Sequence, residues 1–136
     1  MYRKIIIPID LAHLDRLEKA LGTAAKLAAA FDAETCYVSV GASFPSRGYD
    51  PHSFEAKLQE FAREQATRHG LKTTSHAIIT LDPAADLDRT LLKEIEATGC
   101  DLVVMGSHTP GMAEYFISSN AGYIASHSKV SVMVVR

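Results

Sequence analysis

Polar residues that could contact or react with a ligand stand where short apolar runs of this sequence end. Asp10 follows the run 5–9, and Gly106, Ser107 and His108 follow the run 102–105. In an open parallel sheet, ligands bind beyond the carboxyl ends of the strands. A glycine there lets a ligand approach the backbone closely. These two strand ends therefore predict a ligand pocket.

A third polar segment, Ser118-Ser119-Asn120, offers three side chains that can cap a helix. The N-terminus of a helix presents unpaired N–H groups and the positive end of the helix dipole, so it binds phosphate. Capping and phosphate binding use the same N–H groups, and both interpretations stay open for this segment. Asp10 likewise has two interpretations, as a ligand contact or as the cap of the helix that follows it.

Other patterns that carry chemistry are absent from the sequence. The phosphate-binding patterns GxxxxGK[ST] and GxGxxG and the nucleophile pattern GxSxG do not occur. The histidines other than His108 do not pair at the i, i+4 spacing of a helical metal site, so we expect no metal held by the protein alone. We find no serine or cysteine with a base beside it. The residues favour binding over fast catalysis.

The elements that must position these residues alternate along the chain. Apolar, β-branched runs predict strands, and apolar stripes at steps of three and four predict helices. Asp82-Pro83 and Gly99 indicate the start and end of one helix, and Gly70 ends another. We expect strands at 4–9, 35–40, 73–79, 101–105 and 130–135, helices at 15–31, 53–69, 83–98 and 118–127, and surface loop at 41–51. This alternation predicts an α/β fold with a parallel sheet, right-handed crossovers and helices on both faces.

The length and composition of the chain fit one ordinary globular domain spanning 1–136. The chain has 14 basic and 16 acidic side chains and a net charge of -2, which gives no footprint for nucleic acid and no basic membrane-binding helix. The five-residue apolar run near the N-terminus is too short for a signal peptide or a membrane span. Cys36 and Cys100 are expected to be buried thiols. We expect a cytoplasmic protein.

Three features together resemble the universal stress protein family: the start KIIIPID, the Asp-Pro helix start, and MGSH…SSNA…SVMVVR near the C-terminus. The resemblance covers the whole chain except the loop 41–52, and it is strongest to the short nucleotide-binding enterobacterial branch. It implies a Rossmann-like, five-stranded parallel sheet in the order 3-2-1-4-5. It also implies a homodimer formed through the edge strand 130–135, which a proline at Met133 is expected to weaken.

The resemblance further implies an adenine-nucleotide site. Asp10 would face the ribose or a magnesium ion bound to phosphate, Val40 would offer backbone contacts to adenine, and Gly106 would flank the ribose. The implied nucleotide-binding set is Pro8, Ile9, Asp10, Val40, Met105, Gly106, His108, Thr109, Ser118, Ser119 and Asn120. Thr109 and Ser118 stand where ATP-binding members carry glycine, which could narrow the phosphate site.

Three functions follow from these observations. The first is a regulatory protein that binds ATP, AMP or cyclic AMP with Mg²⁺ as a dimer. The second is a slow ATPase in which Asp10 and His108 act. The third is a dimeric interaction protein with a vestigial pocket, which the two missing glycines favour. The sequence names neither the nucleotide, the protein partner nor the stress, and it does not say whether ATP is hydrolysed.

Overall fold

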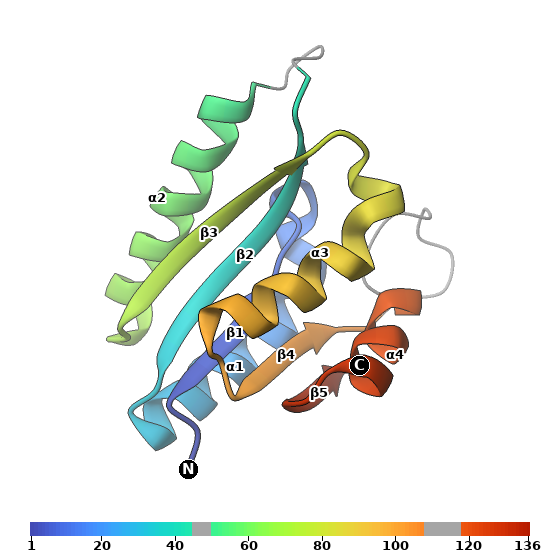
Figure 1. The fold of residues 1–136 in the computed structure, drawn as a ribbon. Helices are drawn as coiled ribbons and strands as arrows, with labels where there is room; N and C mark the ends of the chain where they lie inside the picture. Colours follow the sequence, from blue (N-terminus) through green and yellow to red (C-terminus); the bar gives the residue numbers. More distant parts are fainter. Residues whose placement is uncertain (45–49, 108–117) are drawn as a thin grey trace.

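The structure is a computed structural model, and it describes residues 1–44, 50–107 and 118–136. Five strands form one sheet in the order β3-β2-β1-β4-β5, and every neighbouring pair is parallel. The predicted order is confirmed (Figure 1). The strands are β1 (Lys4–Pro8), β2 (Glu34–Ala42), β3 (Thr73–Thr80), β4 (Leu102–Gly106) and β5 (Ser131–Val135).

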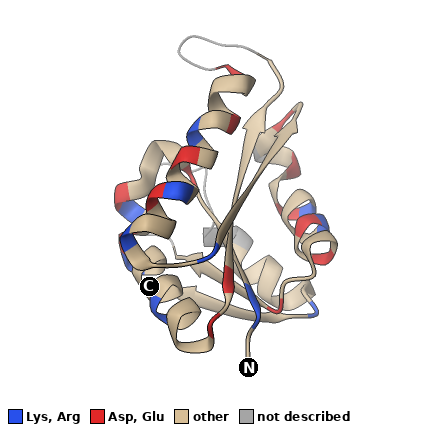
Figure 2. Ribbon diagram, turned by 90° about the vertical axis from the view of Figure 1, so that its left-hand side faces the viewer, with Lys and Arg blue, Asp and Glu red and all other residues tan. Residues whose placement is uncertain are grey.

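Helices cover both faces of this sheet, as the alternating pattern predicts (Figures 1 and 2). On one face, α1 and α2 pack in one core cluster, and on the other face α3 and α4 pack in a second. A short 3₁₀ helix, η1, leads into α1. The helices are η1 (Leu11–Leu17), α1 (Glu18–Phe31), α2 (Pro51–His69), α3 (Pro83–Thr98) and α4 (Ser118–His127).

The central strand β1 is buried on both sides. Ile5 and Ile7 belong to the cluster under α1 and α2, whereas Ile6 belongs to the cluster under α3 and α4. All three are at most 1% exposed. Because successive side chains of a strand point to opposite faces, a strand covered on both faces needs an uninterrupted apolar run. This explains why the run of isoleucines shows no alternation.

The predicted helix boundaries of α3 and the end of α2 are confirmed. The Asp82 carboxylate accepts a hydrogen bond from the N–H of Ala85 at 3.2 Å, and Pro83 follows in the first turn. Gly70 and Gly99 end their helices with φ of 65° and 64°. This left-handed conformation favours glycine, which has no Cβ to clash with the backbone.

Three other boundaries differ from the predictions. His13 has φ -136° and ψ 42°, so the segment after β1 is a separate 3₁₀ helix and α1 begins only at Glu18. Asp50, not Ser53, caps α2, because its carboxylate accepts from the N–H of Ser53 at 3.0 Å. The expected loop 41–51 is also too long, since β2 continues to Ala42 in pairing with β3.

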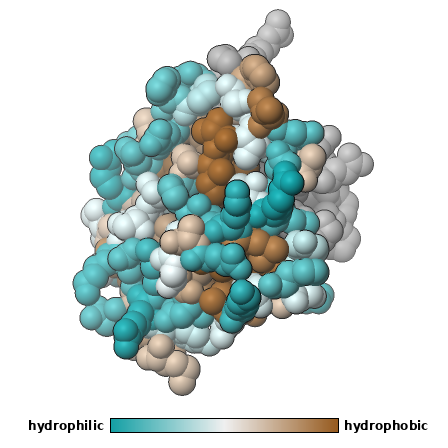
Figure 3. Space-filling view, in the orientation of Figure 1, coloured by the Kyte–Doolittle hydropathy of each residue, from teal (hydrophilic) through white to brown (hydrophobic). Residues whose placement is uncertain are grey.

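Apolar side chains reach the surface over β3 and its turn into α3 (Figure 3). Ile79 is 39% exposed and Leu81 is 73% exposed. The two sheet edges are β3 and β5, and β5 exposes Met133 and Val134. In the described ranges no helix is long and apolar enough to cross a membrane.

Candidate functional site

A pocket of about 480 Å³ opens where β1 and β2 end at the carboxyl edge of the sheet. This is the place at which parallel sheets bind ligands. Two residues of the sequence-predicted set, Asp10 and Val40, line it. The full lining is Asp10, Leu11, Ala12, Ser39, Val40, Gly41, Ala42, Asp50, Ser53, Phe54, Lys57 and Pro83.

Asp10 is both a helix cap and a wall of this pocket. One carboxylate oxygen accepts a hydrogen bond from the N–H of Ala12 at 3.0 Å, which caps η1. The other oxygen lies 2.5 Å from Nδ1 of His13. Asp10 is only 8% exposed, and the side chain of His13 is 47% exposed. The carboxylate is therefore held in one orientation before any ligand arrives.

Ser39 fixes the ends of β1 and β2 relative to each other. Its hydroxyl is buried and donates to the carbonyl of Ile9 at 2.8 Å. The N–H of Ile9 donates in turn to the carbonyl of Val38 at 2.8 Å. Val40 and Gly41 follow Ser39 directly in β2. These hydrogen bonds therefore hold the backbone of Val40 and Gly41 rigidly at the pocket wall. Sequence reasoning did not select Ser39, because nothing in the run 35–40 marks one side chain as facing the end of β1.

The first turns of α2 supply the opposite wall. Asp50, Ser53, Phe54 and Lys57 line the pocket there. Sequence reasoning missed these four residues as pocket residues. A signal exists in the sequence, because a helix that follows strand 35–40 must begin at the carboxyl edge of a parallel sheet. Its first turns therefore lie beside the strand ends that carry Asp10 and Val40.

Four residues of the predicted set lie in the interior and do not line the pocket. Pro8, Ile9 and Met105 are buried, and Met105 packs in the cluster under α3 and α4. Gly106 is also buried, and a Cβ there would lie 2.8 Å from Cδ2 of Leu17. The close approach of η1 to β4 thus gives this glycine a packing role.

The remaining predicted residues belong to the connection after β4 and to the start of α4. His108 and Thr109 lie outside the described residues. Ser118, Ser119 and Asn120 form the first turn of α4, as predicted, and their side chains are not described. The structure therefore places Asp10 and Val40 together in one pocket and puts the capping segment 118–120 in the first turn of its expected helix.

The charges of the pocket are mixed. Asp10 and Asp50 bring two carboxylates, and Lys57 brings one ammonium group. Along α2 and α3, acidic and basic side chains are interspersed (Figure 2). Across residues 1–44, 50–107 and 118–136, no three His, Cys, Asp or Glu side chains cluster to hold a metal ion. A cation in this pocket would therefore need ligands beyond the described side chains, such as phosphate oxygens.

The two cysteines are buried thiols, as expected. Cys36 and Cys100 are 3% and 4% exposed and belong to the cluster under α3 and α4. Burial raises the pKa of both thiols, so each stays protonated at neutral pH. The thiolate is the nucleophilic form, and neither residue lines the pocket.

The described residues of the pocket include groups that can bind a ligand. Asp10 and His13 form a carboxylate–imidazole pair, but within the described residues no hydroxyl or thiol bonds to that imidazole. Nucleophilic catalysis needs a nucleophile within hydrogen-bond reach of its base. What the pocket offers is an apolar wall, backbone groups at the end of β2 and fixed carboxylates, which can hold a flat polar molecule.

The chain is similar to known proteins of one family. The family model described as "Universal stress protein family" matches residues 1–136. Universal stress protein G of Shigella flexneri is 29% identical over 151 residues, covering 100% of both chains. A universal stress family protein from Burkholderia pseudomallei superposes with a TM-score of 0.72 at 23% identity, covering 98% of this chain and 96% of that one.

Two further structures of the same fold hold nucleotides. The universal stress protein from Archaeoglobus fulgidus, solved in complex with dAMP, gives a TM-score of 0.69 at 18% identity and covers 99% and 98% of the two chains. A universal stress protein solved with cAMP gives 0.70 at 16% identity, with 99% and 97% covered. At these identities the likeness establishes a shared fold.

Proposed function

Because the chain belongs to the universal stress protein family, we propose that it is a regulatory protein that binds an adenine nucleotide in the pocket beside Asp10 and Val40. The observation that carries the proposal is the coincidence of this pocket with the carboxyl ends of β1 and β2. In such sheets that edge is the ligand-binding edge. The nucleotide complexes of two proteins of the same fold support the choice of ligand.

In the proposed complex, each part of the nucleotide meets a different element. The adenine lies against the backbone of Val40 and Gly41, and the ribose lies between Asp10 and the end of β4. The phosphates extend toward the N–H groups at the start of α4, where Ser118–Asn120 stand. Mg²⁺ bound to the phosphates would offset their negative charge, and Asp10 is the carboxylate proposed to face it.

We propose that the bound nucleotide has a regulatory role rather than a catalytic one. The pocket's fixed carboxylate and apolar wall favour occupancy, and the described part of the site has no nucleophile beside a base. The proposed protein is a single domain, residues 1–136, that acts in the cytoplasm. Occupancy of its pocket by ATP, AMP or cyclic AMP would change its binding to partners. We propose a homodimer through β5, the exposed sheet edge. A slow ATPase and a vestigial pocket are the competing outcomes of the tests.

Thermal unfolding with Mg²⁺ and each nucleotide tests the proposal directly. Ligand at about 100 times its Kd adds about 2.7 kcal/mol to the free energy of unfolding. For a chain of this length, we expect the midpoint to rise by about 8 °C or more. No shift with ATP, AMP or cyclic AMP would overturn nucleotide binding and favour the vestigial pocket.

A charge-removing variant locates the site. Asp10→Asn keeps a capping side chain at the start of η1 but removes the negative charge. We expect about tenfold weaker binding of ATP with Mg²⁺ and little change for AMP without metal. Asp32→Asn is the matched control, because Asp32 is exposed and Asn tolerates its left-handed conformation, φ 51°. Equal affinities of both variants for ATP would contradict the role of Asp10. ATP turnover that disappears in Asp10→Ala would favour the enzyme.

A further inference from the structure

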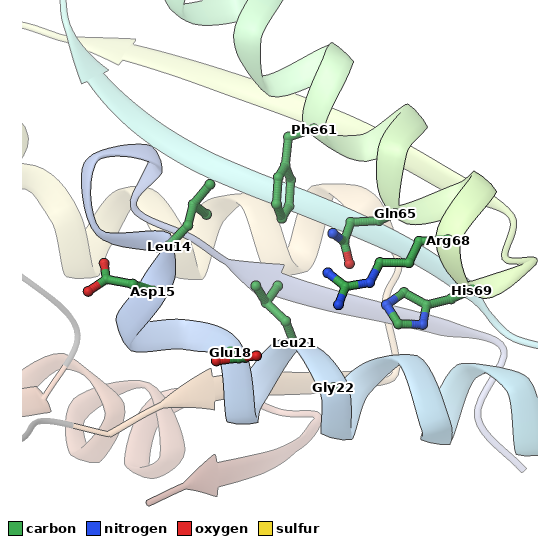
Figure 4. A pocket seen from close by; sticks show the side chains of 9 residues that line it. All are labelled: Leu14, Asp15, Glu18, Leu21, Gly22, Phe61, Gln65, Arg68 and His69. Carbon is green, nitrogen blue, oxygen red and sulfur yellow. The ribbon is translucent and has the colours of Figure 1, made fainter.

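A second pocket lies between α1 and α2, away from the lining of the proposed nucleotide site. Its volume is about 460 Å³, which is within the range of small-molecule sites. Figure 4 shows side chains from both helices converging on it. We call it the helix groove, and its lining is Leu14, Asp15, Glu18, Leu21, Gly22, Phe61, Gln65, Arg68 and His69.

Gln65 is the unusual residue of the helix groove. It is only 7% exposed, yet its side-chain amide has no hydrogen-bond partner in the described part of the chain. In Figure 4 the amide extends from α2 toward α1, into the groove. Most buried polar side chains of native proteins are paired. The amide atoms of Gln65 are not among the fully enclosed unpaired atoms of the described residues, so the amide opens into the groove. It is therefore placed to bond a polar group that enters the groove.

The charges around the helix groove say which polar group fits. Arg68 and His69 stand on the α2 side, and in Figure 4 the guanidinium of Arg68 lies beside the Gln65 amide. Asp15 and Glu18 stand on the side of η1 and α1. None of these four charged or titratable side chains forms an ion pair with another described residue. Guanidinium and amide N–H donors side by side match a carboxylate.

The rest of the lining matches an apolar body. Leu21 from α1 and Phe61 from α2 face each other across the groove in Figure 4, with Leu14 at one end. The Phe61 ring is held edge-on by the ring of Tyr37, with centroids 5.1 Å apart and an interplanar angle of 83°. Because Tyr37 is fully buried, this wall is fixed in place. A flat or aliphatic group can pack against it without rearranging the core.

We propose that the helix groove binds a small organic monocarboxylate with an apolar body. The carboxylate accepts hydrogen bonds from Arg68 and Gln65, and the body packs between Leu21 and Phe61. Asp15 and Glu18 fix the orientation, since they repel a carboxylate at their end of the groove. The site is independent of the nucleotide pocket, so it gives the protein a second small-molecule input.

Titration followed by the backbone amide signals of the ¹⁵N-labelled protein tests the proposal, with 3-phenylpropionate as the probe. We expect saturable shifts at Gly22, Gln65 and neighbouring residues. Phenethylamine has a similar body with a cationic head, and we expect it to bind about tenfold or more weakly. Absence of saturable shifts at these residues, or equal binding of the two probes, would overturn the proposal.

Two variants test separately the contact to the ligand carboxylate and the space that the ligand body needs. Arg68→Gln changes an exposed side chain, and we expect about tenfold weaker binding of 3-phenylpropionate. Gly22→Leu fills the groove, whereas Gly22→Ala is its matched control, because a Cβ at Gly22 meets nothing within 4 Å. We expect binding to be lost in Gly22→Leu and kept in Gly22→Ala, with the response to ATP unchanged in both. Unchanged binding of the probe in Gly22→Leu would place it elsewhere and reject the proposal.

Discussion

Leu17 occupies the space into which a side chain at position 106 would point. A Cβ on Gly106 would lie 2.8 Å from Cδ2 of Leu17, closer than packed side chains approach one another. Gly106 ends β4 and Leu17 ends η1, and both residues are buried. The absent side chain at 106 thus lets the segment after β1 lie against the end of β4, next to the candidate nucleotide pocket.

We therefore expect Gly106→Val to lower the free energy of unfolding by about 1–3 kcal/mol, because Leu17 must move out of its packed position. Leu17→Ala removes the obstructing methyl groups. In that background Gly106→Val should cost clearly less, as chemical denaturation of the four proteins would show. Gly122→Ala is the control, because a Cβ there meets nothing within 4 Å and alanine favours a helix. Equal costs of Gly106→Val in both backgrounds would show that Leu17 is not the obstacle.

Tyr37→Phe is expected to leave stability at neutral pH unchanged or slightly higher. Tyr37 is fully buried, and its hydroxyl has no hydrogen-bond partner among the residues that the structure describes. Removing an unpaired buried hydroxyl takes away a desolvated polar group at no loss of a bond. Urea unfolding at neutral pH measures the change, and a loss of more than about 1 kcal/mol would indicate a hydrogen bond.

The same substitution should change the alkaline limit of stability. Burial raises the pKa of Tyr37 from 10.0 to about 12. Between these values the unfolded chain releases the proton and the folded chain retains it, so stability falls as pH rises. The full loss is roughly 3 kcal/mol, reached near the folded pKa. Unfolding measured from about pH 8 upward should show a smaller loss in Tyr37→Phe than in the natural chain. Tyr123→Phe, at a 40% exposed position, is the control and should behave like the natural chain.

The two thiols should resist modification in the folded protein. Cys36 and Cys100 are buried, and burial raises the pKa of both. Only the small fraction of opened molecules can present a thiolate, so we expect labelling by a disulfide reagent to be slow and to follow unfolding. Ala29→Cys places a thiol on the exposed side of α1 as a fast-reacting control. Labelling of all three thiols at one rate would contradict the described burial.

Position 134, rather than 133, should control the proposed dimer. The N–H of Ser107 donates to the carbonyl of Val135 at 2.7 Å, so Val135 directs its backbone groups toward β4. Because backbone groups of successive residues point to opposite sides of a strand, Met133 also faces β4 and Val134 faces the open edge. A proline at Met133 is therefore expected to disturb the pairing of β5 with β4 as well as the dimer.

Val134→Pro removes an N–H from the open edge of β5 and leaves the pairing with β4 intact. We expect it to shift the protein to monomers in light scattering, with little change in the unfolding of the protomer. Met133→Pro is the comparison, and it should destabilise the protomer itself because it removes a hydrogen bond to β4. A Val134→Pro protein that remains a dimer would rule out pairing of two β5 edges.

Much of the architecture follows from neighbours in the sequence. Asp82-Pro83 begins α3, Gly70 and Gly99 end helices, and the apolar run 5–9 forms a strand buried on both faces. These features depend on local conformational preference and on side-chain periodicity, which a single segment carries in itself. Asp10 and Val40 could be selected for the same reason, since the end of a strand is visible in the sequence.

Only the tertiary structure decided which side chains meet. Ser39 and Lys57 line one pocket because β2 and α2 are brought to the end of β1, and Gln65 is left without a partner because α1 and α2 stand apart at that level. The contact of Leu17 with the backbone at Gly106 joins positions 89 residues apart, by the difference of their numbers. Such contacts depend on how whole elements pack, and local preferences do not encode the distance between two helices or between a helix and a strand.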